Sequence, residues 1–351
     1  MIARRSILRA LPWLALGSDV HALPPANIEF PRDHASHLGQ RTEWWYITGR
    51  VLSGAREFGF QVTFFRSRVD AAQSMQSRFA AKQLIFAHAA IADVDGKRLW
   101  HDQRIAREGF DVASAATDQM RLKLRDWSLV RDTSGAMTAH VVASDFAFDL
   151  RFSPTQSELL QGDHGLSRKG PLPGQSSYYY SEPQLDASGS ISLQGKRIDV
   201  AGRAWLDHEW SDDYLAPQAV GWDWIGMNLD DGSALMAFRL RNADGSTLWD
   251  GGAFRARGHD AYIFSKGEAE FSAQRHWTSP VSGARYPVEW IVRTPADFYR
   301  VSAVVDNQEL DSRMSTGAIY WEGLARLVDS NGRLVGHGYL EMTGYAHRLR
   351  I

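Results

Sequence analysis

The sequence predicts a mainly β protein made of antiparallel strands. Three observations lead to this prediction: short segments alternate between apolar and polar residues, tight-turn dipeptides separate these segments, and helical periodicity is almost absent. In residues 58–64, for example, Phe58, Phe60, Val62 and Phe64 occupy every second position. Period-2 alternation is typical of a strand with one buried face. Many short strands joined by tight turns favour antiparallel barrels or sandwiches.

The rest of the chain follows the same pattern. Residues 120–125 and 146–152 alternate in the same way. The clearest helical segment runs from Ala71 to Ala81, and we expect it to be an insertion between strands. Residues 169–177 are rich in Gly, Pro and Ser, and we expect them to form a long loop. Dipeptides typical of hairpin turns separate the strand segments, namely Ser53-Gly54, Asp95-Gly96, Ser134-Gly135, Asp231-Gly232, Asp244-Gly245 and Asn331-Gly332.

An aromatic motif occurs twice in the chain. Residues 43–49 read Glu-Trp-Trp-Tyr-Ile-Thr-Gly, and residues 221–226 read Gly-Trp-Asp-Trp-Ile-Gly. When Trp44 is aligned on Trp222, an isoleucine and a turn glycine also coincide. A repeat of about 180 residues indicates two copies of one domain rather than a short-period array.

The chain length fits two domains once an N-terminal segment is removed. We place the boundary near Gly202, so that the N-terminal domain spans residues 23–202 and the C-terminal domain spans residues 203–351. This boundary lies just before the segment Ala204–Ser211, which is rich in acidic and aromatic residues.

Residues 1–22 have the features of a twin-arginine signal peptide. Arg4 and Arg5 precede a weak apolar stretch at residues 10–17, and Val20-His21-Ala22 offers a small-residue cleavage site. The mature protein would then begin near Leu23 and be periplasmic. The alternative is a basic tail on a cytoplasmic protein.

The composition excludes several kinds of function. There are no cysteines, so disulfides, thiolate catalysis and Cys-ligated metals are ruled out. The 39 basic and 41 acidic residues give no electrostatic reason to expect a nucleic acid partner. No apolar run is long enough for a membrane-spanning helix. The sequence contains no phosphate-binding loop and no Gly-x-Ser-x-Gly motif, so we expect no nucleotide cofactor and no serine nucleophile of that type. The pair His34 and His37 is poor support for a metal site, so we expect no cofactor and no metal.

The chain contains several longer motifs rich in aromatic and acidic residues, namely residues 43–49, Tyr178-Tyr-Tyr-Ser181, Ala204-Trp-Leu-Asp-His-Glu-Trp-Ser211, Gly221-Trp-Asp-Trp224, Tyr320-Trp-Glu-Gly323 and Tyr339-Leu-Glu-Met-Thr-Gly-Tyr345. Together these motifs resemble the AttH-like family, which includes the carotenoid 1,2-hydratases and many exported bacterial proteins. The resemblance covers roughly residues 30–346 and implies two tandem lipocalin-like (calycin) antiparallel β-barrels packed together. It implies less about chemistry, because the family contains hydratases, pericyclase-like members and proteins of unassigned activity.

The acidic residues of these motifs suit acid catalysis. Hydration of an isolated alkene requires a positioned proton donor, and a carboxylic acid in an apolar pocket stays protonated at neutral pH. Aromatic faces stabilise the cation that forms. On a strand, Asp207 and Glu209 point to one side with Trp205, and His208 points to the other side. The candidate catalytic residues are Asp207, His208, Glu209 and Asp223.

A structural role for the same residues is the other interpretation. Buried acids and a histidine can form a hydrogen-bonded clamp between two barrels. Glu43 poses the same choice, because it can line a pocket or form a buried ion pair with Arg41 or Arg66, and we favour the ion pair. The Tyr178–Tyr180 run fits either a pocket mouth or a strand at the barrel interface. The candidate ligand-binding residues are Glu43, Trp44, Trp45, Tyr179, Tyr180, Trp210, Trp222 and Trp224.

We therefore expect an exported protein that binds an extended apolar ligand, a lipid or an isoprenoid. Its activity would be acid-type hydration or isomerisation of that ligand, which makes it a hydro-lyase if it is an enzyme. The alternative is a non-catalytic periplasmic lipid carrier or an accessory protein of an envelope transporter. A titratable acid facing an apolar cavity distinguishes the enzyme from the carrier.

Overall fold

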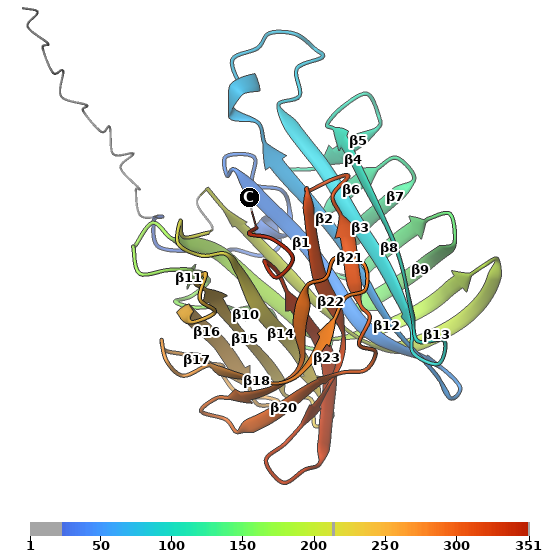
Figure 1. Cartoon of the computed structure of the whole chain (residues 1–351). Coiled ribbons are helices and arrows are strands. Elements are labelled where there is room, and N and C mark those ends of the chain that lie inside the picture. Colours follow the sequence, from blue (N-terminus) through green and yellow to red (C-terminus); the bar gives the residue numbers. More distant parts are fainter. Residues whose placement is uncertain (1–22, 213–214, 350–351) are drawn as a thin grey trace, which may run out of the picture.

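The computed structural model describes residues 23–212 and 215–349, and it confirms the prediction of a mainly β protein (Figure 1). The described residues contain no α-helix. They contain two short 3-10 turns, η1 (Arg32–His34) and η2 (Asp70–Ala72). No helix among them is long and apolar enough to cross a membrane. The predicted signal peptide, residues 1–22, lies outside the described residues.

The helix expected from Ala71 to Ala81 is wrong. Only the turn η2 forms at its start, and the segment continues as an irregular connection between two strands. Between residues 71 and 81 only Ala72 is buried. A short helix in a protein is stabilised mainly by an apolar face packed on a core, and this segment has no such face.

The first sheet begins with four consecutive antiparallel strands, β4 to β1, and ends with five more, β9 to β5. Its strand order is β4-β3-β2-β1-β13-β12-β9-β8-β7-β6-β5, with β10 and β11 paired to β12. The edge strands approach each other, since β3 and β4 contact β6, so the sheet is a nearly closed barrel. The strands are β1 (Thr42–Ser53), β2 (Arg56–Arg68), β3 (Gln83–Asp93), β4 (Arg98–Arg107), β5 (Ala113–Ala115), β6 (Arg121–Leu124), β7 (Trp127–Arg131), β8 (Met137–Val142), β9 (Phe146–Ser153), β10 (Leu159–Leu160), β11 (Leu166–Arg168), β12 (Ser176–Leu193) and β13 (Lys196–Ser211).

The second sheet repeats this arrangement. Its order is β17-β16-β15-β14-β23-β22-β20-β19-β18, with β21 paired to β22. In each sheet the first strand lies between the second strand and the last strand. The strands are β14 (Gly221–Leu229), β15 (Ala234–Arg241), β16 (Thr247–Arg255), β17 (Tyr262–Phe264), β18 (Glu270–Thr278), β19 (Arg285–Arg293), β20 (Phe298–Ala303), β21 (Glu309–Ser312), β22 (Ala318–Val328) and β23 (Leu334–Met342).

The two tryptophans of the sequence repeat occupy corresponding places in the two sheets. Trp44 lies on β1 and is paired with Phe65 of β2, and Trp222 lies on β14 and is paired with Leu240 of β15. The structure is therefore two lipocalin-like barrels of the same strand order, as the repeat predicts.

Gly202, near which we place the domain boundary, is part of a strand of the first sheet. It lies within β13, whose residues as far as Ser211 pair with β1 of the first sheet. A Cβ atom at Gly202 would overlap the carbonyl oxygen of Arg50 on β1, so the glycine permits close strand approach there. The chain passes from the first sheet to the second between Ser211 and Gly221.

Each sheet buries one face in its own core, and part of its other face packs against the neighbouring sheet. Residues such as Trp45 and Leu206 pack inside the first barrel, and Ile225 and Leu340 pack inside the second. A third apolar cluster joins the outer faces of both sheets; it includes Tyr46, Tyr179 and Trp205 from the first and Trp224, Leu324 and Tyr339 from the second. We call this region the seam.

Candidate functional site

A cavity of about 320 Å³ lies in the seam, between the outer faces of the two sheets. This volume is at the lower end of the range typical of small-molecule sites. Four carboxyl groups border it, those of Asp207, Glu209, Glu322 and Glu341. Its aromatic lining residues are Trp44, Tyr46, Phe65, Phe86, Tyr179, Trp222, Trp224, Phe238 and Tyr320.

Strand alternation determines which residues reach the cavity. On β13, Asp207 and Glu209 face the seam, whereas His208 between them faces the interior of the first barrel. On β14, Trp222 and Trp224 face the cavity, and Asp223 faces the interior of the second barrel. Because successive side chains of a strand point to opposite faces, one segment supplies both the seam and a barrel core.

Asp207 is buried and held by three hydrogen-bond donors. Tyr179 donates to its Oδ2 at 2.8 Å, Ser181 donates to its Oδ1 at 2.6 Å, and the indole of Trp205 donates to Oδ1 at 2.7 Å. Trp224 donates in turn to the Tyr179 hydroxyl at 3.1 Å. Burial raises the pKa of Asp207 to about 7, although these hydrogen bonds oppose the rise.

Glu341 and Glu322 face each other on β23 and β22. Burial raises the pKa of Glu341 to about 7, with a further contribution from the nearby Asp207 charge, and the indole of Trp222 donates to Glu341 Oε2 at 3.0 Å. Burial and then the Glu341 charge raise the pKa of Glu322 well above its ordinary value. Like charges this close disfavour ionisation of both acids, so at least one proton stays on the pair at neutral pH.

Three polar atoms in this part of the seam make no hydrogen bond of good geometry to a described residue. Two of them, Glu322 Oε1 and the Tyr46 hydroxyl, are buried, and these two side chains lie close enough to shift each other's pKa. The Glu341 Oε1 atom also makes no hydrogen bond to a described residue, and the Glu341 side chain keeps accessible surface on the cavity. Buried polar groups normally have partners, so these atoms indicate room for a ligand or water.

Glu209 is paired with Lys169 at the same cavity. The Lys169 Nζ atom lies 2.9 Å from Glu209 Oε1 and 4.7 Å from the Tyr179 ring centroid, and Ser177 also donates to Glu209 Oε1. Burial raises the pKa of Glu209, and the Lys169 charge opposes that rise. A carboxylate compensated by an ammonium group is a poorer proton donor than Glu341 or Glu322.

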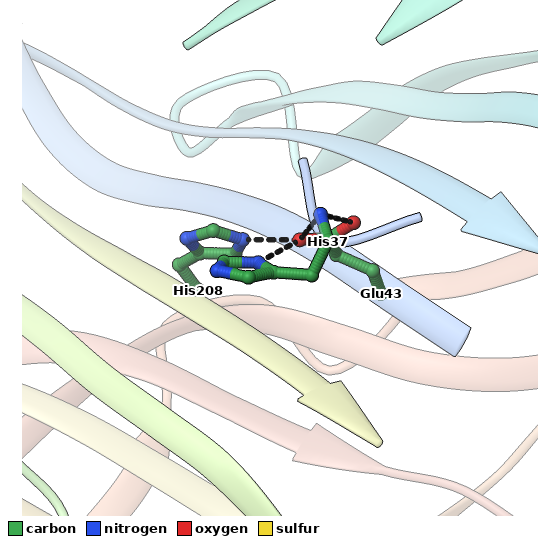
Figure 2. Close-up of side chains that lie close together, drawn as sticks. All are labelled: His37, Glu43 and His208. Atoms are coloured by element: carbon green, nitrogen blue, oxygen red, sulfur yellow. Dashed lines mark hydrogen bonds and ion pairs between the residues drawn. The ribbon is translucent and has the colours of Figure 1, made fainter. Parts of the chain in front are cut away.

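Glu43 and His208 lie inside the first barrel (Figure 2). Glu43 accepts hydrogen bonds from Arg66 Nε at 2.8 Å and Ser36 Oγ at 2.8 Å, and His208 Nε2 lies 3.0 Å from Glu43 Oε1. His37 Nδ1 lies 2.7 Å from the same oxygen. Burial raises the pKa of Glu43, but hydrogen bonds to His208 and His37 hold it well below its usual value. The buried ion pair between Glu43 and Arg66 is the structural role that we favoured.

Asp223 forms a comparable cluster inside the second barrel. Its Oδ2 atom accepts a hydrogen bond from Arg239 Nε at 2.8 Å and lies 3.1 Å from Arg241 Nε, and Tyr345 donates to its Oδ1 at 2.9 Å. Asp223 is fully buried, and two guanidinium groups compensate its charge. This arrangement suits a structural ion pair rather than a proton donor to a ligand in the seam.

Within residues 23–212 and 215–349, two groups of side chains have spacings that a metal ion could use. They are His37, Glu43 and His208 in the first group, and His34, Glu158 and Glu182 in the second. In the first group, hydrogen bonds among the three side chains and to Arg66 already satisfy these groups, and Arg66 already balances the charge of Glu43. A divalent ion would have to displace this network.

The candidate ligand-binding residues divide between two places. Trp44, Tyr179, Trp222 and Trp224 line the cavity. Glu43, Trp45, Tyr180 and Trp210 lie inside the first barrel, where Trp210 stacks on His37 with a centroid separation of 3.8 Å. Sequence reasoning missed Glu322, Glu341 and Lys169.

The sequence repeat contained the signal for Glu341. Asp207 is paired with Tyr46 on β1, two residues after Trp44, and Glu341 is paired with Trp224 on β14, two residues after Trp222. Extending the repeat to the last strand of each domain would have placed Glu341 at the position of Asp207.

A larger groove of about 770 Å³ lies at the other end of the seam. Its lining is mostly polar and includes Arg50, Arg203, Arg255 and Arg257. Trp205 borders the groove, and its indole nitrogen donates to Asp207, which lines the cavity. We assign the site to the smaller cavity because it combines apolar walls with acids of raised pKa.

The raised pKa of Asp207 predicts a pH-dependent difference in stability between the wild type and Asp207→Asn. The ordinary aspartate pKa is 3.8 and the folded value is about 7, so the folded protein binds more protons than the unfolded chain between these pH values. Wild-type stability should therefore fall relative to the variant as pH rises from about 4 to 7, by up to about 1.4 kcal/mol per pH unit, and the difference should level off above pH 7. Urea unfolding of both proteins across this range measures it. A constant difference would show that Asp207 is ionised throughout.

Fold and site together define a class of protein: a tandem lipocalin-like barrel pair with acidic groups at an apolar cavity between the barrels. The AttH-like family profile matches residues 21–345, and the chain belongs to this family. Among proteins of curated function, no significant match was found.

Several solved structures have the same fold. A protein from Nitrosomonas europaea provisionally named AttH is 44% identical, with a TM-score of 0.86 over 92% of this chain and 99% of that chain. Kievitone hydratase from Nectria haematococca shares the fold, with 11% identity and a TM-score of 0.71 over 91% of this chain and 93% of that one. The protein CghA, solved with Sch210972, is 13% identical, with a TM-score of 0.53 over 87% of this chain and 88% of that one.

Proposed function

We propose that this protein binds an extended apolar ligand, a lipid or an isoprenoid, in the seam cavity and hydrates or isomerises an alkene of that ligand by acid catalysis. The observation that carries the proposal is the set of acids with raised pKa values on the walls of an aromatic cavity. The fold shared with kievitone hydratase is consistent with hydration.

The environments of the acids suggest a division of roles. Glu341 is the proposed proton donor, because one of its oxygens borders the cavity without a protein hydrogen bond, and because burial and the nearby Asp207 charge disfavour its ionisation. Asp207 is the proposed base, because its three donors stabilise a carboxylate.

The proposed hydration uses Glu341 as the acid and Asp207 as the base. Glu341 gives its proton to one alkene carbon, and the cation that forms on the other carbon is stabilised by the rings of Trp44, Trp222 and Trp224. Water adds to the cation and loses a proton to Asp207, which leaves an alcohol. Proton exchange between the two neighbouring carboxyl groups restores the starting state. Transfer of a proton from another carbon of the cation to Asp207 gives an isomerised alkene instead.

The test has two parts. Native mass spectrometry of the purified protein, followed by lipid extraction, should show a bound apolar molecule. Incubation with an acyclic isoprenoid alkene in H₂¹⁸O should then give an alcohol that contains ¹⁸O. Retention of the alkene without ¹⁸O incorporation or isomerisation would favour the non-catalytic lipid carrier, and absence of any apolar ligand would contradict both.

We also propose export by the twin-arginine route, supported by Arg4 and Arg5 before the apolar stretch. Replacing both arginines with lysine should leave the precursor in the cytoplasm with residues 1–22 attached. Cell fractionation and mass spectrometry of the N-terminus measure the outcome. Unchanged amounts of mature periplasmic protein would contradict this route.

A further inference from the structure

The cavity opens at one end of the seam. The lining residues at this opening are partly or fully exposed, namely Arg41, Ser67, Thr316 and Leu349. Deeper in the cavity, Asp207 and other lining residues are buried. The opening is thus bordered by the segment before β1, the end of β2, the β21–β22 turn and the C-terminal segment.

Large apolar side chains are exposed around this opening. Of the twelve large hydrophobic residues exposed among the described residues, seven lie on the segments at this end. We call these seven the mouth collar: Leu38, Met75, Phe79, Ile105, Phe110, Leu172 and Met314. Figure 1 shows the β2–β3 connection, which carries Met75 and Phe79, projecting beyond the ends of the strands.

The collar residues are close to residues that line the cavity. Met314 precedes the lining residue Ser315, and Ile105 is paired across the sheet with the lining residue Phe86. Leu172 follows Lys169 in the same loop, and Leu38 precedes Arg41. The connection with Met75 and Phe79 joins β2 and β3, which contribute Ser67 and Phe86.

The outermost part of the collar is an aromatic pair beside a basic residue. Phe79 and Phe110 are stacked with centroids 5.4 Å apart, yet they keep 71% and 50% of their surfaces exposed. The Arg107 guanidinium lies 5.3 Å from the Phe79 centroid and 4.2 Å from the Phe110 centroid. Two more basic residues, Arg78 and Lys82, lie in the same connection as Phe79. The sequence also places two acids nearby, Glu108 and Asp111, and Asp111 is paired with Lys123.

We propose that the mouth collar inserts into the surface of a lipid bilayer, so that an apolar ligand passes between the bilayer and the cavity without crossing water. Exposed aromatic and aliphatic side chains gain free energy when they enter the interfacial region, and basic side chains beside them reach the headgroups. The basic residues fit a bilayer that contains anionic lipid. The identity of the passenger rests on the proposed function, whereas the docking itself rests on the collar.

Cosedimentation with large unilamellar vesicles tests the docking. The full-length protein should sediment with phosphatidylcholine vesicles, and more strongly when they contain phosphatidylglycerol. The double variant Phe79→Ser/Phe110→Ser should bind at least about tenfold more weakly than the wild type, because two apolar insertions are lost. Met314→Ser should weaken binding by a smaller factor.

A matched control uses exposed apolar residues elsewhere. Phe298 is 50% exposed and Leu334 is 48% exposed, and neither lines the cavity. Phe298 begins β20 and Leu334 begins β23, at the end of the second sheet opposite to the cavity opening. The double variant Phe298→Ser/Leu334→Ser should bind vesicles as the wild type does. Equal loss in both double variants, or no vesicle binding by the wild type, would overturn the proposal.

Two other results would also overturn it. A concentration-dependent dimer in sedimentation velocity, lost in the Phe79 and Phe110 variant while vesicles stay unbound, would make the collar an interface between copies of this chain. Binding that depends on phosphatidylglycerol and survives the loss of both phenylalanines would make the contact purely electrostatic. If vesicle binding fails but native mass spectrometry still finds an apolar ligand, only the docking proposal falls.

Discussion

Replacing Arg66 with methionine is expected to lower the free energy of unfolding by about 3–5 kcal/mol, because it leaves the buried carboxylate of Glu43 without its ion partner. Both side chains are fully buried, and Arg66 also donates to Gln83 and to the backbone carbonyls of His37 and Gln40. Arg66 therefore fastens the segment before β1 to the first barrel. Urea unfolding followed by tryptophan fluorescence measures the change.

Arg68 provides a matched control two residues further along β2. Its side chain is partly exposed and pairs with Asp70 and Asp212 at the surface. Arg68→Met should cost no more than about 1 kcal/mol, as exposed ion pairs usually do. Similar losses in both variants would show that the buried pair has no special role.

The strand alternation of this chain made much of the site predictable. It assigned Asp207 and Glu209 to one face of a strand and His208 to the other, and the hydrogen bonds place them so. Alternation alone does not say which face meets the barrel core and which meets the seam, because both faces of β13 are buried. Asp207 and His208 are equally inaccessible to solvent, so their different surroundings appear only when both barrels are in place.

The repeat made the architecture predictable but not the point where one sheet ends. In each domain the last strand returns to pair with the first, and this long-range pairing leaves no local trace in the sequence. We placed the domain boundary near Gly202, just before the Ala204–Ser211 segment, although this glycine lies within β13 and allows two strands to approach closely. Glu322 was missed for a related reason: it is far from Asp207 along the chain, and the packing of the second barrel on the first brings both to one cavity. Glu341 could have been predicted, because the repeat places it at the position of Asp207.

Replacing Glu341 with glutamine is expected to reduce turnover about 10²- to 10⁴-fold, the usual contribution of a general acid, while ligand retention stays nearly unchanged. The amide keeps the size of the side chain and can still accept the hydrogen bond from Trp222, but it has no proton to give to an alkene. Asp207→Asn should also reduce turnover by removing the base. The measurements are ¹⁸O incorporation into an acyclic isoprenoid alkene and ligand retention in native mass spectrometry.

Asp223→Asn separates chemistry from structure in the same experiment. Asp223 is buried, but it lies inside the second barrel with Arg239, Arg241 and Tyr345. This variant should lose about 3–5 kcal/mol of stability, because it uncovers buried guanidinium charge, and should keep its turnover per folded molecule. If Glu341→Gln and Asp207→Asn instead melt well below the wild type and lose the ligand together, the acids of the seam are a clamp between the barrels. A catalytic seam requires the opposite pattern: the seam variants lose only turnover, and Asp223→Asn loses only stability. The reason is that a proton donor contributes in the transition state and little to ground-state affinity.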